Sequence, residues 1–225
     1  MDLALNGHVA LVVGGAGYIG SAVVDRLRAE GATALSAGRN GGDVVMDAAD
    51  DGSVASAVAG VVAEHGRLDA LIITAAPAAQ TLDPALSNDP ADVLAAVDGK
   101  AMTFLRAANA VLPIMREAGY GRVVGIAGQS ALVTGDVRGS IRNAALIIAA
   151  ENLADACAGT GVTVNVVNPG RVTDEPSADV QPGRGGESSP AQIADLIAFL
   201  VSPLAAAVSG ESIAVGHRVR GVTHL

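Results

Sequence analysis

Aromatic side chains are almost absent from this sequence. Its 225 residues include two tyrosines, two phenylalanines and no tryptophan, so aromatic residues make up 2% of the chain. Half of the residues are nevertheless hydrophobic, which means that a core must be built from alanine, valine, leucine and isoleucine. Tyr18 and Tyr120 are the only phenols available for acid–base chemistry.

Lysine and cysteine each occur once, as Lys100 and Cys157. A single cysteine excludes an internal disulfide and fits a reducing compartment, so we expect a cytoplasmic protein. Cys157 falls in an alanine-rich helical pattern, which favours a small buried hydrophobic residue over a nucleophile. A metal site is not predicted, because ligand spacing is absent among the four histidines, His8, His65, His217 and His224.

Positive charge is also scarce. Lysine and arginine together number 14 against 23 acidic residues, which gives a formal net charge of −9. This balance excludes the basic surface that a nucleic-acid partner requires. No apolar run approaches the roughly 18 residues that cross a bilayer, and no signal peptide precedes the first predicted strand. We therefore expect neither a nucleic-acid partner nor a membrane partner.

Short runs of valine, isoleucine and leucine alternate with alanine-rich helical patterns. The apolar runs predict strands at Val9–Val13, Thr33–Ala37, Val44–Met46, Ala70–Thr74, Arg122–Ala127, Val162–Val167 and Ser212–Val215. Helices are predicted at Ser21–Glu30, Ser53–His65, Ala91–Ala118, Asn143–Cys157 and Pro190–Val201. Continuous apolar strands between helices indicate a parallel sheet buried on both faces. We expect one domain over residues 1–225, a doubly wound α/β (Rossmann) fold with seven parallel strands between two helical layers.

The segment His8–Gly20 is the most informative motif. A predicted strand leads into glycines at positions 14, 17 and 20, and a helical pattern follows at once. This order is the context that a dinucleotide-binding fingerprint requires, with a pyrophosphate at the helix N-terminus. The alternative is a glycine-rich turn without a ligand. The fingerprint predicts a cofactor cradle formed by Gly14, Gly15, Ala16, Gly17, Tyr18, Ile19 and Gly20.

Six segments, taken in order, resemble the short-chain dehydrogenase/reductase family over nearly the whole chain. Besides the glycine loop, they are Val44–Asp47, Asp69–Ala75, Phe104–Met115, Val164–Gly170 and Phe199–Val215. The resemblance implies hydride transfer between a nicotinamide cofactor and a small carbonyl or alcohol substrate, in a homodimer or homotetramer. It also implies cofactor contacts at Asp47, Ala48, Ala75, Ala76, Pro169, Gly170 and Val172.

The end of the second predicted strand indicates which dinucleotide is preferred. NAD-specific Rossmann folds place an acidic residue there for the ribose 2′-hydroxyl, whereas this chain has Gly38, Arg39 and Asn40. A guanidinium suits a 2′-phosphate, so we expect NADP(H) to be preferred over NAD(H). The alternative is a solvated Arg39, because the short stretch Gly41–Asp43 replaces the family's second helix.

The resemblance fails at the catalytic positions. Reductases of this family use a Tyr-x-x-x-Lys pair, a serine and an asparagine. Counting from the neighbouring motifs places the tyrosine at Gly139 or Ile141, the lysine at Asn143, the serine at Gly128 and the asparagine at Lys100. Because no tyrosine lies near the only lysine, the pair cannot exist, and we predict an altered active site.

Lys100 and Asn143 are the candidate catalytic residues. Asn143 has the chemistry to bind the ribose hydroxyls, and a partly buried Lys100 has the chemistry of an acid or electrostatic stabiliser. The alternative for Lys100 is a lysine that reaches solvent. Gln129 and Ser130 follow the fifth predicted strand and either bind a polar substrate or cap the next segment.

Two segments are predicted to be mobile loops, and one of them follows the sixth predicted strand. Arg171–Ser189 is rich in proline, glycine and serine and is either a substrate lid or a disordered surface loop. A second mobile loop is predicted at Ala76–Pro90, and the tail Gly216–Leu225 either closes a subunit contact or frays. Three functions fit these residues: an NADP(H)-dependent oxidoreductase, a catalytically inactive NADP(H) sensor or partner subunit, and a repurposed non-redox enzyme.

Overall fold

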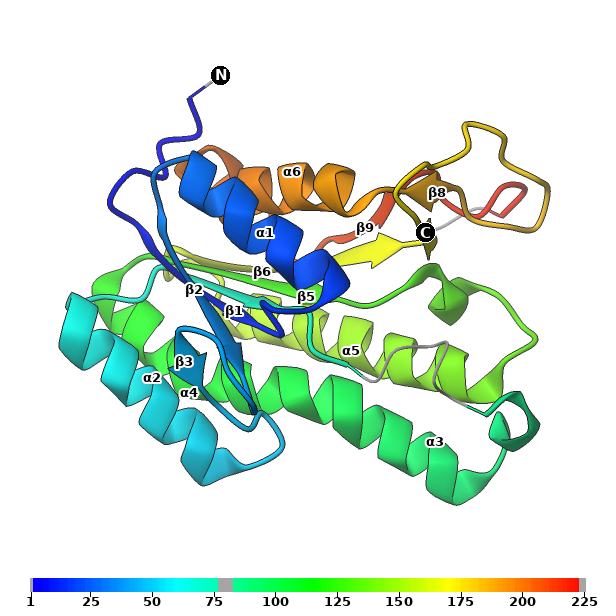
Figure 1. The fold of residues 1–225 in the computed structure, drawn as a ribbon, viewed down its shortest axis with the longest axis horizontal. Coiled ribbons are helices and arrows are strands. Elements are labelled where there is room, and N and C mark those ends of the chain that lie inside the picture. Colours follow the sequence, from blue (N-terminus) through cyan, green and yellow to red (C-terminus); the bar gives the residue numbers. More distant parts are fainter. Residues whose placement is uncertain (1, 77–82, 223–225) are drawn as a thin grey trace.

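The computed structural model describes residues 2–76 and 83–222. Within them, parallel strands form a seven-stranded sheet in the order β3-β2-β1-β4-β5-β6-β9 (Figure 1). The strands are β1 (Val9–Val13), β2 (Thr33–Gly38), β3 (Val44–Val45), β4 (Ala70–Ile73), β5 (Gly121–Ile126), β6 (Val162–Pro169) and β9 (Ser212–Val215). Since β2 and β4 flank β1, the strand order reverses there, and doubly wound sheets bind ligands at this switch point.

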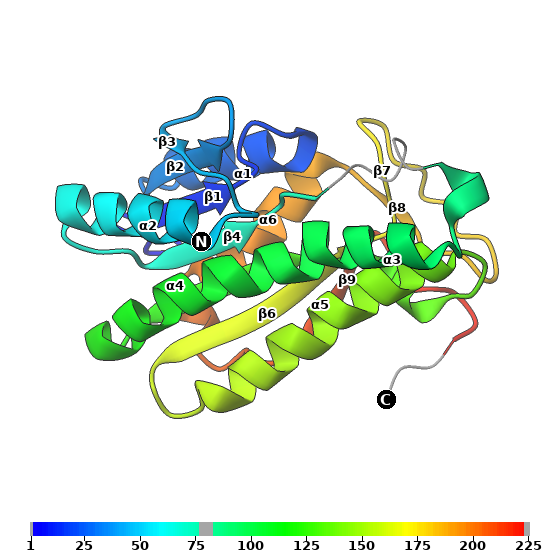
Figure 2. The ribbon, with the colours of Figure 1, turned by 90° about the horizontal axis from the view of Figure 1, so that it is seen from below.

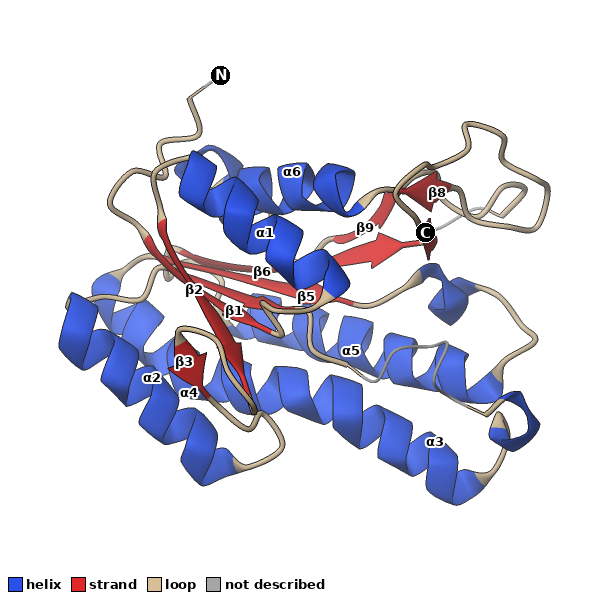
Figure 3. Ribbon diagram, viewed as in Figure 1, coloured by secondary structure: helices blue, strands red, loops and turns tan. Residues whose placement is uncertain are grey.

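Helices cover both faces of the sheet. One face carries α1 (Tyr18–Ala29) and α6 (Pro190–Val201). On the other side lie α2 (Asp51–His65), α3 (Pro90–Val97), α4 (Thr103–Ala118) and α5 (Val137–Ala156). Figure 2 shows α4 and α5 side by side, and Figure 3 shows the red sheet between the two blue helical layers. The predicted three-layer Rossmann fold is confirmed.

The strand pleat divides the apolar side chains between two cores. Val9, Leu11 and Val13 of β1 pack with α2, α4 and α5, while Ala10 and Val12 pack with α1 and α6. Alternate side chains of a strand point to opposite faces, so a continuous apolar run supplies both cores at once. Cys157 is fully buried in the first core, as its helical pattern predicted.

The structure departs from the predicted elements in two places. The single helix predicted at Ala91–Ala118 is interrupted by a wide π-helical turn at Asp98–Met102, between α3 and α4. Helix α5 begins at Val137, six residues before the predicted start, because Arg138 is buried at its first turn and forms an ion pair with Asp92 of α3 at 2.6 Å. Buried charge of this kind cannot be read from a polarity pattern.

The segment Arg171–Ser189 is called the lid below, after the role predicted for it. Its ends form a two-stranded parallel sheet from β7 (Arg171–Val172) and β8 (Glu187–Ser188). The second predicted loop contains a short 3₁₀ turn at Pro84–Leu86, and its residues 77–82 lie outside the described residues. Within the described ranges, no helix combines the length and apolarity that spanning a bilayer requires.

Candidate functional site

The loop between β1 and α1 is packed so closely that side chains cannot be accommodated at several positions. Gly14 has φ +83°, and a Cβ atom there would lie 2.8 Å from the Ala75 backbone nitrogen. A Cβ atom on Gly20 would lie 2.1 Å from the Gly14 carbonyl oxygen. Thr74 holds the loop by donating its hydroxyl to the carbonyls of Val13 and Gly14, at 3.0 and 3.1 Å. Sequence reasoning did not assign Thr74, although its place directly after β4 was an available signal.

The N-terminus of α1 is free to receive an anion. Its N-cap, Gly17, provides no side-chain hydrogen bond, and the first turn carries no acidic residue. The side-chain oxygens of Asp50, Asp89 and Ser189 cap α2, α3 and α6, whereas α5, like α1, has no side-chain cap. An uncapped helix start presents unpaired N–H groups and a positive dipole end. The predicted cradle residues 14–20 therefore fit a pyrophosphate.

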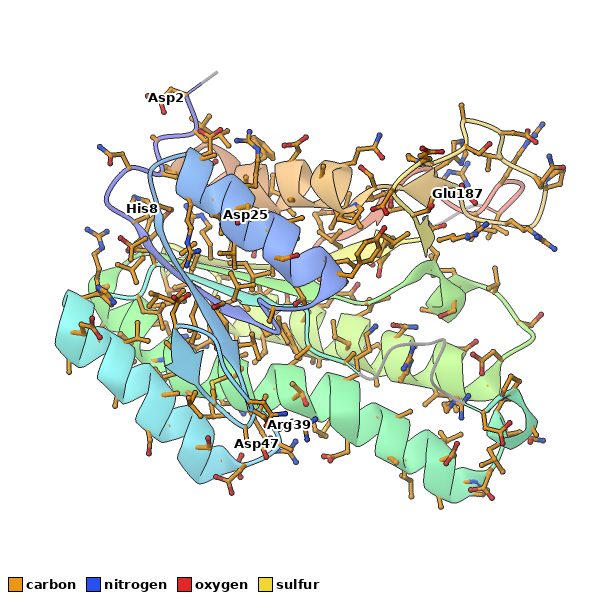
Figure 4. The ribbon with its side chains drawn as sticks, in the orientation of Figure 1. Asp2, His8, Asp25, Arg39, Asp47 and Glu187 are labelled. Atoms are coloured by element: carbon orange, nitrogen blue, oxygen red, sulfur yellow. The ribbon has the colours of Figure 1, made fainter. Side chains whose placement is uncertain are left out.

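Arg39 follows β2 and Asp47 lies just after β3, and the pairing of Gly38 with Val45 places the ends of these two strands next to each other (Figure 4 labels both residues). Arg39 is exposed, and within the described residues no hydrogen bond or ion pair engages its guanidinium. The nearby carboxylate of Asp43 is already committed to Arg28, at 2.9 Å, and to the backbone and hydroxyl of Ser36, both at 2.8 Å. These bonds lower the Asp43 pKa, with the backbone bond from Ser36 as the main cause.

The opposite half of the predicted cofactor site is formed by the segments that follow β4 and β6. Ala75 and Ala76 come after Thr74, just beyond β4, while Pro169 ends β6 and Val172 ends β7. Gly170 is required between them, because a Cβ atom would lie 2.2 Å from the Gly186 carbonyl oxygen. The predicted cofactor residues thus follow the carboxyl ends of the parallel strands, with Ala48 three residues after β3 and Val172 at the end of β7 in the small second sheet. This is the edge at which parallel sheets bind nucleotides.

Lys100 lies inside the protein, so the alternative of a lysine that reaches solvent is wrong. The π-helical turn directs it inward; only 6% of the residue is exposed. Its ammonium group donates to the carbonyl of Ala127, just beyond β5, at 2.8 Å. Burial, and secondarily the positive charge of Arg142 on α5, lower the pKa of Lys100 to about 7. Desolvation disfavours the charged amine, so Lys100 exchanges a proton near neutral pH.

Asn143 belongs to α5 and is also buried. Its side chain lies next to Gly128, just beyond the end of β5. Its amide nitrogen donates to the Ser130 hydroxyl at 2.7 Å and to the Gly139 carbonyl at 2.8 Å. A Cβ atom on Gly128 would lie 3.4 Å from this amide, so Asn143 and Lys100 converge on Ala127 and Gly128. The Asn143 carbonyl oxygen is buried without a hydrogen-bond partner. A buried acceptor of this kind suits a ligand hydroxyl.

Neither phenol stands beside these residues. Tyr120 precedes β5, at the opposite edge of the sheet, and its hydroxyl donates to the Val201 carbonyl at 3.3 Å. Tyr18 begins α1, and its hydroxyl donates to the Asp174 carboxylate of the lid at 2.6 Å. This bond, which sequence reasoning missed, raises the pKa of Tyr18. At Gly139, a counted position of the family tyrosine, a Cβ atom would lie 2.3 Å from the Asp136 carboxylate.

The side chains of Gln129 and Ser130 form hydrogen bonds to other parts of the chain. The Gln129 amide donates to the carbonyls of Asn168, Val215 and His217. It therefore bonds to distant segments and does not cap the 3₁₀ turn Gln129–Leu132 in the way that the capping alternative predicted. Ser130 accepts from Asn143. Over residues 2–76 and 83–222, no three His, Cys, Asp or Glu side chains gather where they could hold a metal ion; His224 lies outside these ranges.

A doubly wound sheet with a glycine-rich loop at its switch point is the arrangement typical of dinucleotide-binding folds. Residues 12–217 match the family model described as enoyl-(acyl carrier protein) reductase. The chain belongs to the short-chain dehydrogenase/reductase family, whose members bind a nicotinamide cofactor and act on small molecules.

Two curated relatives are oxidoreductases by name. The chain is 32% identical to (2S)-[(R)-hydroxy(phenyl)methyl]succinyl-CoA dehydrogenase subunit BbsC of Thauera aromatica, with 93% of each protein covered. It is 33% identical to D-threitol dehydrogenase of Mycolicibacterium smegmatis, covering 95% of this chain and 93% of the relative. A solved structure titled ribose-5-phosphate isomerase from Brucella melitensis is similar with a TM-score of 0.83 and 26% identity, covering 96% of this chain and 93% of that one.

Proposed function

We propose that this protein is an NADP(H)-dependent oxidoreductase that acts on a small carbonyl or alcohol and uses Lys100 in place of the family's tyrosine. The proposal rests on the placement of Lys100. Its amine is buried just beyond the end of β5 and donates to the Ala127 carbonyl at 2.8 Å. Reduction of a carbonyl develops negative charge on oxygen, so the site needs a proton donor or a positive charge there. Lys100 supplies both below its pKa of about 7.

The cofactor-binding residues have separate roles in this proposal. Residues 14–20 hold the pyrophosphate, Arg39 pairs with the 2′-phosphate, and Asp47 and Ala48 contact the adenine. Ala75, Ala76, Pro169, Gly170 and Val172 border the nicotinamide half. Asn143 accepts a hydrogen bond from the ribose through its unpaired carbonyl oxygen. The bound cofactor supplies or accepts the hydride, while the chain positions the substrate and moves the proton.

Titration of NADPH and NADH fluorescence tests the binding half of the proposal. Binding that favours NADPH supports it, and the absence of binding to either dinucleotide refutes it. The catalytic half is tested with a panel of ketones and alcohols on the wild type and on Lys100→Ala. General-acid assistance contributes on the order of 10² to 10⁴ in rate, so the variant should lose a comparable factor. Arg106→Ala is the control, because Arg106 also lies on this helical stretch but pairs with Asp98.

A second candidate function is that of a non-catalytic partner subunit. The missing phenol favours it, and the name of the Thauera relative describes that protein as a dehydrogenase subunit. Apolar side chains for a subunit contact are exposed on α3 and α5, namely Leu94, Ile141 and Ile148, and they equally suit a homodimer or homotetramer in the cytoplasm. Intact NADPH binding with no turnover of any substrate, in the wild type as well as in Lys100→Ala, identifies this function instead.

A further inference from the structure

The lid is tied to the C-terminal segment of the chain. The Gly183 amide donates to the Arg220 carbonyl at 2.9 Å, and the Arg220 amide donates back to the Arg184 carbonyl at 3.0 Å. The Gly186 amide donates to the His217 carbonyl at 3.0 Å. The Arg220 guanidinium adds a bond to the Val180 carbonyl at 2.8 Å. Residues 216–222, called the strap below, therefore run along the second half of the lid and pair with its backbone.

Gln129 anchors the strap to the sheet. Its amide nitrogen lies 3.3 Å from the Asn168 carbonyl at the end of β6, 3.3 Å from the Val215 carbonyl at the end of β9, and 2.9 Å from the His217 carbonyl of the strap. Gln129 is 4% exposed, so these bonds are shielded from water. Val219 provides a second anchor, since it is 1% exposed between two exposed arginines.

The crossing of lid and strap is closely packed. Gly216 has φ +93°, and a Cβ atom there would lie 2.4 Å from the Glu187 carbonyl oxygen. A Cβ atom on Gly186 would lie 2.8 Å from the His217 nitrogen, and one on Gly185 would lie 2.1 Å from the Gln129 side-chain oxygen. Glycine at these three positions lets the base of the lid, the strap and Gln129 meet at backbone contact distance.

We propose that residues 216–222 are a strap that fixes the lid against the carboxyl edge of the sheet, with Gln129 as its anchor. The C-terminal segment then forms part of the site's architecture, since it positions the segment that follows Pro169 and Gly170. This role differs from both earlier expectations for the tail, a subunit contact or a frayed end. It does not depend on the proposed function, because it rests only on contacts within the chain.

Amide hydrogen exchange at Gly183 and Gly186 tests the strap directly, since both amides donate to strap carbonyls. Gly216→Ala introduces a Cβ against the Glu187 carbonyl and should speed exchange at both sites about two- to tenfold, the effect of losing one backbone hydrogen bond. Gly221→Ala is the matched control. Gly221 also has a positive φ, +89°, but a Cβ atom there meets nothing within 4 Å, so the lid amides should be unchanged.

A second pair of variants tests Gln129 as the anchor. This pair shows whether the strap fixes the lid even if Gly216→Ala fails to fold. Gln129→Ala removes three bonds to the strap and its surroundings and should speed exchange at Gly186. Ser130→Ala, one residue further on, removes only bonds to Asn143 and Gly139 and should leave Gly186 unchanged. Unchanged exchange at Gly183 and Gly186 in a folded Gly216→Ala or Gln129→Ala protein overturns the strap. A loss of NADPH binding would bear on the proposed function alone.

Discussion

Replacing Lys100 with methionine should stabilise the protein at neutral pH. The substitution keeps an unbranched apolar stem in a position that is 94% buried and removes the charge. Lys100 has an unfolded pKa near 10.5 and a folded pKa of about 7, with burial as the main cause. Between these values the unfolded chain binds a proton that the folded chain does not. The folding penalty is therefore complete below pH 7, shrinks as the pH rises and vanishes above about pH 10.5.

The size of the Lys100 pKa shift determines how much the free energy of unfolding changes. Linkage gives a penalty of about 4 kcal/mol at pH 7, about 2 kcal/mol at pH 9 and about 1 kcal/mol at pH 10. Against this gain, Lys100→Met loses the hydrogen bond to the Ala127 carbonyl, which costs about 1 kcal/mol at every pH. The variant should thus be more stable than the wild type by about 3 kcal/mol at pH 7, and the two should be nearly equal at pH 10.

Urea unfolding at pH 7, 8, 9 and 10 measures this difference. Arg106→Met is the control, because Arg106 is a partly exposed cation whose charge is paired with Asp98 and Asp51. The difference in stability between Arg106→Met and the wild type should not shrink in this way as the pH rises from 7 to 10. A constant difference between Lys100→Met and the wild type from pH 7 to pH 10 would show that Lys100 carries its charge inside the protein at neutral pH. That result would refute the reasoning.

Three further substitutions address the predicted cofactor site and the lid. Arg39→Ala removes the cation proposed for the 2′-phosphate and should weaken NADPH binding about tenfold with NADH binding unchanged; equal losses for both in fluorescence titration would contradict that assignment. Gly20→Ala places a Cβ 2.1 Å from a backbone oxygen and should lower NADPH affinity at least tenfold, whereas Gly60→Ala, in open space on α2, should not. Tyr18→Phe removes the bond to Asp174 and should speed amide exchange in residues 174–179 about two- to tenfold; unchanged exchange would show that the bond does not hold the lid.

Much of the fold could be predicted because its signals are local. The strand Val9–Val13 and the helix Pro190–Val201 have the predicted bounds, since apolar periodicity and a proline at the first helical position act within a few residues. The two-residue strands β7 and β8 could not be predicted. Their pairing joins segments 16 residues apart and carries no periodic pattern.

The candidate site was predictable in part for the same reason. A glycine fingerprint is a local pattern, so the cradle at residues 14–20 could be located from sequence. The burial of Lys100 depends on a turn of unusual width and on packing against α5, and a count of residues does not contain that information. The bonds of Gln129 to three carbonyls of distant segments are of the same kind. The sequence has no Tyr-x-x-x-Lys pair, and the altered active site that follows from this stays a prediction.

The π-helical turn at Asp98–Met102 also fixes how two helices face the protein. An α-helix advances about 100° per residue, so the extra residue in a wide turn rotates everything on one side of it relative to the other. Deleting one residue from this turn would restore regular winding, and α3 and α4 would then be unable to keep their present faces inward together. The turn that buries Lys100 therefore also lets α3 and α4 direct their apolar faces inward together.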